Sequence, residues 1–223
     1  AAPKCFYIED ALQDIGIPVF HDDQHGTAIV VLAGLINSLK VVGKKFEDIK
    51  VVFNGAGASG IACAKILLEI GVSDIILVDT RGAIYKGREG LTSVKEEIAL
   101  MTNPRSVKGD IHEAIKGADV FIGLSVANVL DASDAGAMNA DAIVLAMANP
   151  VPEIMPEEAK LGGAKVVGTG RSDLPNQINN VLAFPGVLRG TLDVRAARIT
   201  MSMKTAAAAA IAGLIATPTA DQI

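Results

Sequence analysis

A glycine-rich segment offers the clearest chemistry in this sequence. Gly55-Ala56-Gly57-Ala58-Ser59-Gly60 has the spacing GxGxxG, and it separates the β-branched run 50–54 from a helical stretch. In such a setting the first glycine permits a tight turn, the second lets a pyrophosphate approach the backbone, and the third lets the helix pack closely. The helix N-terminus adds free N–H groups that bind phosphate. The segment therefore predicts a dinucleotide site, whereas the spacing taken alone also fits an ordinary strand–helix turn.

An acidic residue follows this loop at the distance that a dinucleotide site needs. Asp79 ends the next apolar run, roughly 20 residues further on, where a carboxylate can accept hydrogen bonds from the adenosine ribose. A carboxylate there favours NAD because it repels a 2′-phosphate. Arg81, Lys86 and Arg88 follow closely, and they could instead receive a 2′-phosphate. We expect NAD, and NADP stays open.

Several other polar residues could bind a metal ion or lie beside a cofactor. Asp22 and Asp23 precede a long apolar helix, and on their own they are explained equally well as an N-cap pair. His21 and His25 are four residues apart without the glutamate of a zinc motif, so we interpret them as polar loop residues. Ser125 follows the third apolar run and should lie near a cofactor at the carboxyl edge of a sheet.

The elements that must position these residues alternate along the chain. Short apolar runs predict buried strands, and their alternation with helical stretches predicts a parallel sheet covered on both faces. The expected strands are 50–54, 74–78, 119–123, 142–147 and 165–167, and the expected helices are 1–14, 27–42 with Thr27 as its cap, 58–70, 94–102, 111–116, 131–138, 156–161 and 195–216. The predicted fold class is α/β, a Rossmann-like, doubly wound and mostly parallel sheet with flanking N- and C-terminal helices.

The composition narrows the function classes. Of the 223 residues 50% are hydrophobic and 20% are charged, and the net charge is −5. Nucleic-acid binding needs clustered Lys and Arg, which are scattered here, so we expect no nucleic-acid partner. The apolar runs 26–36 and 206–216 are too short to span a bilayer, and the N-terminus does not resemble a signal peptide. Cys5 and Cys63 have neither metal-site nor disulfide-framework spacing. We expect a cytoplasmic protein with no membrane partner.

Five segments resemble one family and occur in that family's order. They are 20–28 (FHDDQHGTA), 54–60 (NGAGASG), 148–154 (ANPVPEI), 177–186 (QINNVLAFPG) and 189–195 (RGTLDVR). Together they resemble the malic enzymes over essentially the whole chain. The resemblance implies oxidative decarboxylation of malate to pyruvate and carbon dioxide, with reduction of NAD or NADP and with Mg²⁺ or Mn²⁺ in the site.

The resemblance also implies roles for individual residues. Asp23 matches the family's metal-binding aspartate, and Asp22 matches the acidic residue beside the catalytic base. Asn149 and Asn180 match the asparagines near the nicotinamide and the malate carboxylate, where an uncharged amide orients its partner without titrating. A hard dication on the C2 oxygen of malate would stabilise the enolate that decarboxylation leaves. The implied site is Asp22 and Asn180 for catalysis, Asp23 for the metal, Asn149 and Asn180 for the substrate, and Ser125, Asn149, Asp79 and the glycine loop for the cofactor.

Some residues of the family's site have no counterpart here. The general-base lysine and the catalytic tyrosine of the family lie in a preceding domain, and its Glu-Asp metal pair comes just before the segment that starts here at Ala1. Glu9-Asp10 has the right letters but lies too close to Asp23, so we do not make it the metal pair. We expect residues 1–24 to be a segment of an interdomain cleft that carries the metal loop, and residues 25–223 to be the dinucleotide-binding domain. The expected partners are malate or pyruvate, a missing N-terminal catalytic domain, and further copies of the chain in a homo-oligomer.

Three alternatives stay open at this point. Malolactic decarboxylation of malate to lactate shares these segments. An amino-acid dehydrogenase also places a buried helix before a Rossmann domain, but Asp22-Asp23 and Asn179-Asn180 argue against it. The third alternative is a nucleotide-binding module without catalytic activity. The absence of the family's general-base lysine favours it, whereas the presence of Asp23, which matches the metal-binding aspartate, favours an enzyme.

Overall fold

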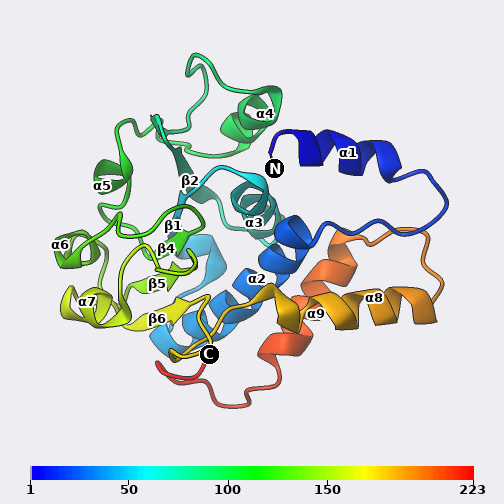
Figure 1. Cartoon of the computed structure of the whole chain (residues 1–223). Helices are drawn as coiled ribbons and strands as arrows, with labels where there is room; N and C mark the ends of the chain where they lie inside the picture. The colour runs from blue at the N-terminus through cyan, green and yellow to red at the C-terminus, as the bar shows by residue number, and fades with distance from the viewer. Residues whose placement is uncertain (1) are drawn as a thin grey trace.

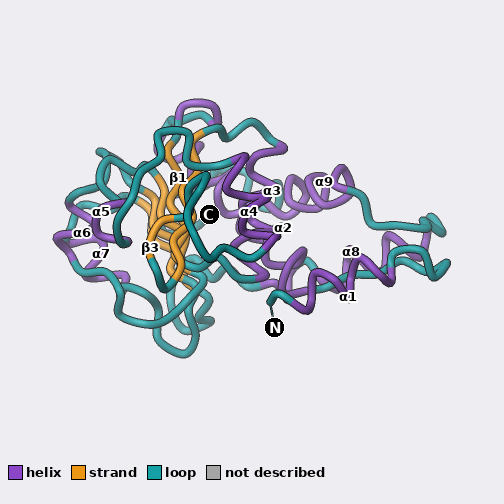
Figure 2. Tube along the Cα trace, turned by 90° about the horizontal axis from the view of Figure 1, so that it is seen from above, coloured by secondary structure: helices purple, strands orange, loops and turns teal. Residues whose placement is uncertain are grey.

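The fold is a six-stranded sheet between two layers of helices, as Figures 1 and 2 show for a computed structural model that describes residues 2–223. The strands are β1 (Lys50–Asn54), β2 (Asp74–Asp79), β3 (Gly82–Ala83), β4 (Val120–Gly123), β5 (Ile143–Ala146) and β6 (Val166–Thr169). Their order is β3-β2-β1-β4-β5-β6, and all pairs are parallel except β2 with β3. The predicted Rossmann-like fold class is confirmed, and the short antiparallel β3 is an addition to it.

The strands are buried on both faces because alternate residues enter two separate hydrophobic cores. Val51 and Phe53 of β1 belong to one core, and Val52 belongs to the other. The first core is covered by α2 (Asp22–Val42), α3 (Ala58–Glu69), α4 (Ser93–Met101) and α9 (Met201–Ala212), and the second by α5 (Ile111–Ala114), α6 (Ala132–Gly136) and α7 (Pro156–Leu161). Figure 2 shows the sheet edge-on between these layers. Continuous apolar strands are what a doubly covered parallel sheet requires.

The strand order creates a crevice at the carboxyl edge of the sheet. Strand β1 lies between β2 and β4, so the chain leaves β1 toward one side and later returns on the other. The loops after β1 and β4 are tied to their neighbours, because Gly55 N–H donates to Val78 at 2.8 Å and Leu124 N–H donates to Asn54 at 2.9 Å. Doubly wound sheets bind their ligands where the strand order reverses in this way.

Helix α2 begins five residues earlier than predicted. Thr27 is not its cap: the helix starts at Asp22 after an extended His21, so Asp22 and Asp23 occupy the first turn, where the helix dipole favours negative charge. Gly43, with φ of +67°, ends the helix as expected. The full helix of 21 residues is long and apolar enough to cross a membrane, unlike the shorter run read from the sequence. Most of it is buried and it packs against α3 and α9, which is the environment of a core helix.

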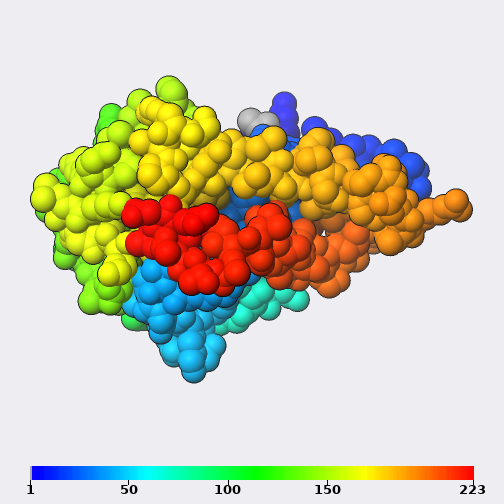
Figure 3. Space-filling view, turned by 90° about the horizontal axis from the view of Figure 1, so that it is seen from below, coloured from blue at the N-terminus to red at the C-terminus, as the bar shows by residue number. Residues whose placement is uncertain are grey.

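The C-terminal region holds two helices where the sequence predicted one from 195 to 216. Helix α8 (Phe184–Asp193) was not predicted, because its proline and glycines resemble a loop, although proline is well suited to a first helical turn. Helix α9 starts at Met201, where the Thr200 hydroxyl caps it by accepting from Met203 N–H. The terminal segment then returns to the sheet, and Asn176 bonds the backbone of Ala220 and Ile223. Figure 3 shows this segment, in red, against the yellow chain that precedes α8.

Helix α1 (Lys4–Leu12) extends along the same side of the molecule as α8, away from the sheet (Figures 1 and 2). It corresponds to the helix predicted for 1–14, and it has no buried residue. Two short 3-10 turns are also present, η1 (Phe46–Asp48) before β1 and η2 (Asn180–Leu182) before α8.

Candidate cofactor and substrate site

The three glycines of the loop after β1 have three different surroundings. Gly55 has φ of +120°, and a Cβ there would lie 2.7 Å from the Leu124 carbonyl oxygen. A Cβ on Gly60 would lie 1.9 Å from the carbonyl oxygen of Gly55, so α3 packs too closely against the loop for any side chain. A Cβ on Gly57 would meet no atom within 4 Å. The loop thus has a tight turn, a close helix contact and an open backbone position, which is the arrangement that a pyrophosphate needs.

A cavity of about 390 Å³ lies over this loop. Gly55, Ala56 and Gly57 line it together with Asp79 and Ser125, so most of the expected cofactor residues meet in one place. Ala58 and Ser59 instead form the first turn of α3. Among residues 2–223 no side chain caps that turn, which leaves its N–H groups available to an anion. The size and lining of the cavity fit part of a dinucleotide.

Asp79 is held by cations that come from two other elements. Arg88 donates to both carboxylate oxygens at 3.0 and 2.6 Å, Lys95 of α4 donates at 2.5 Å, and Arg81 N–H donates at 2.9 Å. Burial alone would raise the pKa of Asp79, but these hydrogen bonds outweigh it and hold the pKa well below its usual range. Asp79 therefore lies at the cavity as expected, with its charge already balanced. Lys95, which also lines the cavity, was missed because nothing local in the sequence links it to Asp79.

Asn149 and Ser125 lie on the loops that follow β5 and β4. Both side chains are exposed, and Ser125 lines the cavity. A Cβ on Gly170, just after β6, would lie 2.9 Å from the Asn149 amide nitrogen, so glycine leaves room for Asn149 there. The carboxyl ends of three neighbouring strands thus present small or amide side chains at one edge of the sheet.

Asp22 and Asn180 are in direct contact although they are far apart in the sequence. The Asn180 amide donates to the Asp22 carboxylate, and a Cβ on Gly26 would clash with both residues. Burial and the neighbouring charge of Asp23 raise the pKa of Asp22. The other oxygen of Asp22 is buried and has no hydrogen-bond partner within residues 2–223. An unsatisfied buried carboxylate oxygen marks a place where a further donor is expected.

The family assignment rests on a match to a family model that covers nearly the whole chain. The family model described as malic enzyme, NAD binding domain, matches residues 24–222. The chain belongs to the malic enzyme family.

Named malic enzymes align with this chain over its full extent. It is 58% identical over 217 residues to the bifunctional malic/malolactic enzyme of Bacillus subtilis (strain 168), which covers 96% of this chain and 53% of that protein. It is 50% identical over 227 residues to the NADP-dependent malic enzyme of Rhizobium meliloti (strain 1021), covering 100% of this chain and 29% of that protein. The crystal structure of the NAD-dependent malic enzyme of Thermotoga maritima superposes with a TM-score of 0.96 at 46% identity, covering 100% of this chain and 59% of that one. The chain thus spans about half or less of the length of these curated relatives.

Asp23, which matches the metal-binding aspartate of malic enzymes, belongs to no cluster of three or more possible metal ligands within residues 2–223. Asp23 is exposed in the first turn of α2. Within residues 2–223 no three His, Cys, Asp or Glu side chains come together in a way that could hold a metal ion. Mg²⁺ and Mn²⁺ sites need more than one fixed oxygen ligand, and within residues 2–223 Asp23 is not part of such a group of three or more ligands.

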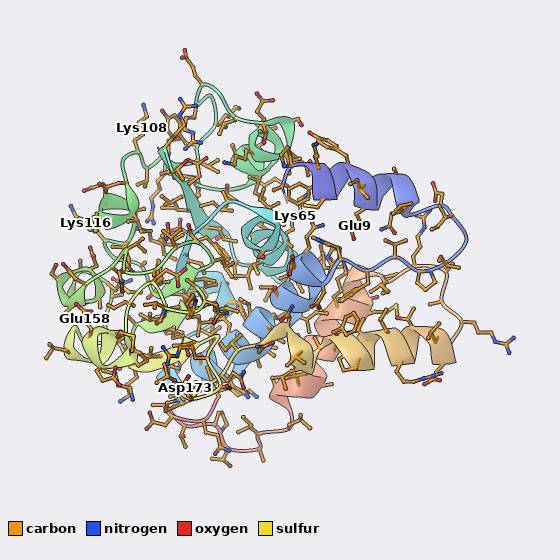
Figure 4. The ribbon with its side chains drawn as sticks, in the orientation of Figure 1. Glu9, Lys65, Lys108, Lys116, Glu158 and Asp173 are labelled. Atoms are coloured by element: carbon orange, nitrogen blue, oxygen red, sulfur yellow. The ribbon has the colours of Figure 1, made fainter. Side chains whose placement is uncertain are left out.

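The interpretation of His25 as a loop residue was wrong. His25 lies within α2, where its Nδ1 atom is 2.8 Å from the Lys204 ammonium and its Nε2 atom contacts the Glu9 carboxylate. Glu9 also accepts from Gln24 at 2.6 Å, so Glu9 is occupied and is not a partner of Asp23. These contacts link α1, α2 and α9, and Figure 4 shows Glu9 on the face of α1 turned toward the rest of the domain. The partners are 16 and 179 residues from His25, beyond any local sequence signal.

Proposed function

We propose that this chain is the dinucleotide-binding half of an enzyme that oxidises malate to pyruvate and carbon dioxide with NAD or NADP. The observation that carries the proposal is the cavity at the reversal of strand order, which gathers the glycine loop, Asp79 and Ser125 in a chain of the malic enzyme family. When bound, the nicotinamide cofactor accepts the hydride from C2 of malate. The residues of this chain bind and orient the two molecules.

Each part of the cavity has a task in binding. The open backbone at Gly57 and the free N–H groups of α3 hold the pyrophosphate. Asp79 faces the adenosine end, where Arg88 and Lys95 offset its charge. That balance weakens the repulsion of a 2′-phosphate which a lone carboxylate would exert. The residues here therefore support use of NADP as well as NAD, and relatives of both kinds are similar to the chain.

The Asp22–Asn180 pair supports the substrate end of the proposal. The raised pKa of Asp22 and its unsatisfied oxygen suit a carboxyl that shares a proton with a catalytic group contributed from outside residues 1–223. The Asn180 amide keeps that carboxyl in place and can also bond the malate carboxylate. Asn149, exposed at the end of β5, is placed to bond the substrate or the carboxamide of the cofactor.

The proposed whole protein needs a second domain. Asp23 would join carboxylates from that domain in holding Mg²⁺ or Mn²⁺, since it belongs to no group of three or more possible ligands within residues 2–223. Support for a partner surface comes from large apolar side chains left exposed on the two extended helices and beside them, namely Tyr7, Ile8, Leu12, Ile15, Ile17, Val181, Leu182, Phe184, Leu192 and Val194. Such a patch is typical of a buried interface, here with the preceding domain or with a second copy. Both cysteines are free, which suits the cytoplasmic location that we propose.

A second reaction is supported by one comparison. The Bacillus subtilis relative is named as a bifunctional malic/malolactic enzyme, and decarboxylation of malate to lactate would use the same cofactor without net reduction. One assay on the full-length protein separates the two reactions. Malate, Mn²⁺ and NAD or NADP are supplied, and pyruvate, lactate and reduced cofactor are measured together. Equal amounts of pyruvate and reduced cofactor support the proposal, lactate without reduced cofactor supports the malolactic reaction, and neither product leaves a nucleotide-binding module.

A further inference from the structure

A carboxylate lies buried beneath the carboxyl edge of the sheet, and it is not one of the residues that bind cofactor or substrate in the proposed function. Glu153 lies in the loop between β5 and α7, and its exposed fraction is 0%. One of its oxygens accepts from Ser125 N–H at 3.0 Å, and the other accepts from Ala148 N–H at 3.0 Å. Ser125 belongs to the loop after β4, whereas Ala148 directly precedes Asn149. A single side chain therefore joins the two loops that carry Ser125 and Asn149.

The backbone around Glu153 strengthens the same connection. The Glu153 carbonyl accepts from Val129 N–H at 2.9 Å and Leu130 N–H at 3.1 Å, and the Pro152 carbonyl accepts from Asn128 N–H at 3.1 Å. The loop after β4 is thus fixed near its start by the Glu153 side chain and near its end by the Glu153 backbone.

The last residue of β4 makes room for this carboxylate. A Cβ on Gly123 would lie 2.2 Å from the carboxyl carbon of Glu153. Gly123 does not have a positive φ, so its backbone would accept alanine and only the space is lacking. Glycine at the end of β4 is therefore needed to leave space for the buried Glu153 carboxylate.

A fully buried charge is costly, and here no cation offsets it within the described part of the chain. Burial raises the pKa of Glu153, and only backbone N–H donors oppose that effect. Glutamine would be a less costly residue for packing alone, because it carries no charge. A glutamine has only one acceptor oxygen, however, and its NH₂ group would face the second N–H donor. Two loops held by one side chain require a carboxylate.

We propose that Glu153 is a positioning residue, which holds Ser125 and Asn149 in register for cofactor and substrate. The inference rests on the proposed malate reaction. It predicts that loss of the carboxylate lets Ser125, at the start of the loop after β4, shift relative to Ala148 and Asn149, while the backbone bonds of Pro152 and Glu153 still hold the end of that loop. The reacting groups are then misaligned while the fold persists.

A matched control exists at the opposite edge of the same sheet. Asp119, just before β4, is also buried and also joins separate segments, because it accepts from Lys50 N–H at 2.8 Å, Lys44 at 2.9 Å and Asn139 at 3.0 Å. It lies at the amino ends of the strands, away from the cavity. Asp119→Asn therefore reports the effect of losing a buried carboxylate without touching the loops in question.

The experiment compares Glu153→Gln, Gly123→Ala and Asp119→Asn in the full-length protein. Steady-state kinetics with malate, cofactor binding and thermal unfolding are measured for each variant. We expect Glu153→Gln and Gly123→Ala to lower kcat by about ten-fold or more, as a displacement of about 1 Å does in many enzymes, with a smaller rise in KM. Asp119→Asn should lower Tm to a similar extent and keep a kcat close to that of the wild type. Gly123→Ala keeps the glutamate, so it tests its position separately from its charge.

Two results would overturn the inference. One is a kcat for Glu153→Gln and Gly123→Ala close to the wild-type value. The other is a loss of activity in Glu153→Gln and Gly123→Ala that is fully explained by a smaller amount of folded protein, with a kcat per folded molecule equal to that of Asp119→Asn. Glu153 would then contribute to stability alone. Failure of the proposed function is recognised separately, because the wild-type protein would then form neither pyruvate nor lactate from malate.

Discussion

At the scale of single residues, the loop after β1 shows that glycines with the same spacing have different physical reasons. Gly60 is required by contact, because a Cβ there would lie 1.9 Å from the Gly55 carbonyl oxygen. Gly57 is surrounded by open space, and nothing in the folded chain itself demands glycine there. We therefore attribute the glycine at position 57 to the proposed dinucleotide. This difference makes the same substitution give opposite results at the two positions.

We predict that Gly60→Ala costs about 1–3 kcal/mol of unfolding free energy, as overpacking of a tight contact does. Gly57→Ala should leave stability near that of the wild type and weaken dinucleotide binding, because its methyl group occupies the space of the pyrophosphate. Urea unfolding and NAD titration calorimetry on both variants check this. Equal losses of stability, or unchanged NAD binding by Gly57→Ala, would refute the assignment of the loop.

Asp79 gives a prediction for the dependence of stability on pH. Its pKa is lower in the folded chain than in the unfolded chain, because hydrogen bonds from Arg88 and Lys95 outweigh burial. A lowered pKa adds stability that is fully present above the unfolded value, about 3.9, and is lost as the pH falls through the folded value. Asp79→Asn should therefore lower the unfolding free energy at neutral pH by about 1–3 kcal/mol.

The difference between Asp79→Asn and the wild type should shrink below about pH 4, where the wild-type carboxyl begins to lose its advantage. Urea unfolding at a series of pH values measures it, and Asp74→Asn is a suitable control because Asp74 is only half-buried and its partner Arg105 is exposed. If this difference in unfolding free energy stays constant down to the lowest pH at which the protein folds, the ion pairs of Asp79 contribute little to stability.

At the scale of elements, α1 and α2 are stabilised in different ways. Helix α2 is a core helix with many buried apolar residues, whereas α1 has none. Only Phe6 of α1 packs partly buried against the core, and the other contacts of the helix are polar. They are those of Glu9 with Gln24 and His25 and the hydrogen bond of Tyr7 with Ser93 at 2.9 Å. Elements held in this way open locally at low free energy.

Substitution of Glu9 should release α1 and leave the core intact. In Glu9→Ala we expect the backbone amides of residues 4–12 to exchange hydrogen faster, while the amides of α2 keep their protection. Asp10→Ala is the matched control, since Asp10 lies on the same helix and is exposed. Hydrogen-exchange mass spectrometry makes the comparison. Unchanged exchange in α1 would show that other contacts hold it.

At the scale of the whole molecule, residues 2–223 hold the cavity that we propose for the cofactor, and they show no cluster of metal ligands beside it. The cavity is built from the loops of one sheet edge, so it forms within residues 2–223. Within residues 2–223 Asp23 belongs to no group of three or more possible metal ligands, and Glu9 is engaged by α2, so we propose that the metal and proton-transfer groups of malate oxidation come partly from outside this chain. Cofactor binding and turnover should therefore separate when the chain is made alone.

We predict that residues 1–223 bind NAD or NADP but do not oxidise malate with Mn²⁺. Fluorescence titration measures the binding, and the formation of reduced cofactor measures the turnover. Addition of the rest of the full-length protein as a separate piece should restore part of the activity if the two associate. Robust malate oxidation by residues 1–223 alone would show that the catalytic groups lie within this chain, and Glu9, Asp10 and Lys4 would be the first to substitute.

Much of the fold could be read from local pattern. The five parallel strands, the glycine loop, the end of α2 at Gly43 and the helix Pro156–Leu161 all depend on neighbours within a few residues, and the structure has them where the pattern predicts or close to it, whereas the short strand β3 was not predicted. The start of α2 and the existence of α8 were missed. Both depend on packing: Gly26 stands inside α2 because Asp22 and Asn180 fill the space above it, and α8 forms although its composition resembles a loop.

The sequence by itself determined which residue types stand at the carboxyl ends of the strands, because strand and loop patterns are short-range. Only the tertiary structure decided which of them meet. Lys95 reaches Asp79, Asn180 reaches Asp22 and Glu153 joins two loops. These contacts span from 5 to 158 residues of sequence. They depend on how helices and loops that are distant in the sequence pack around the sheet, because a local pattern specifies an element but not its neighbours in space.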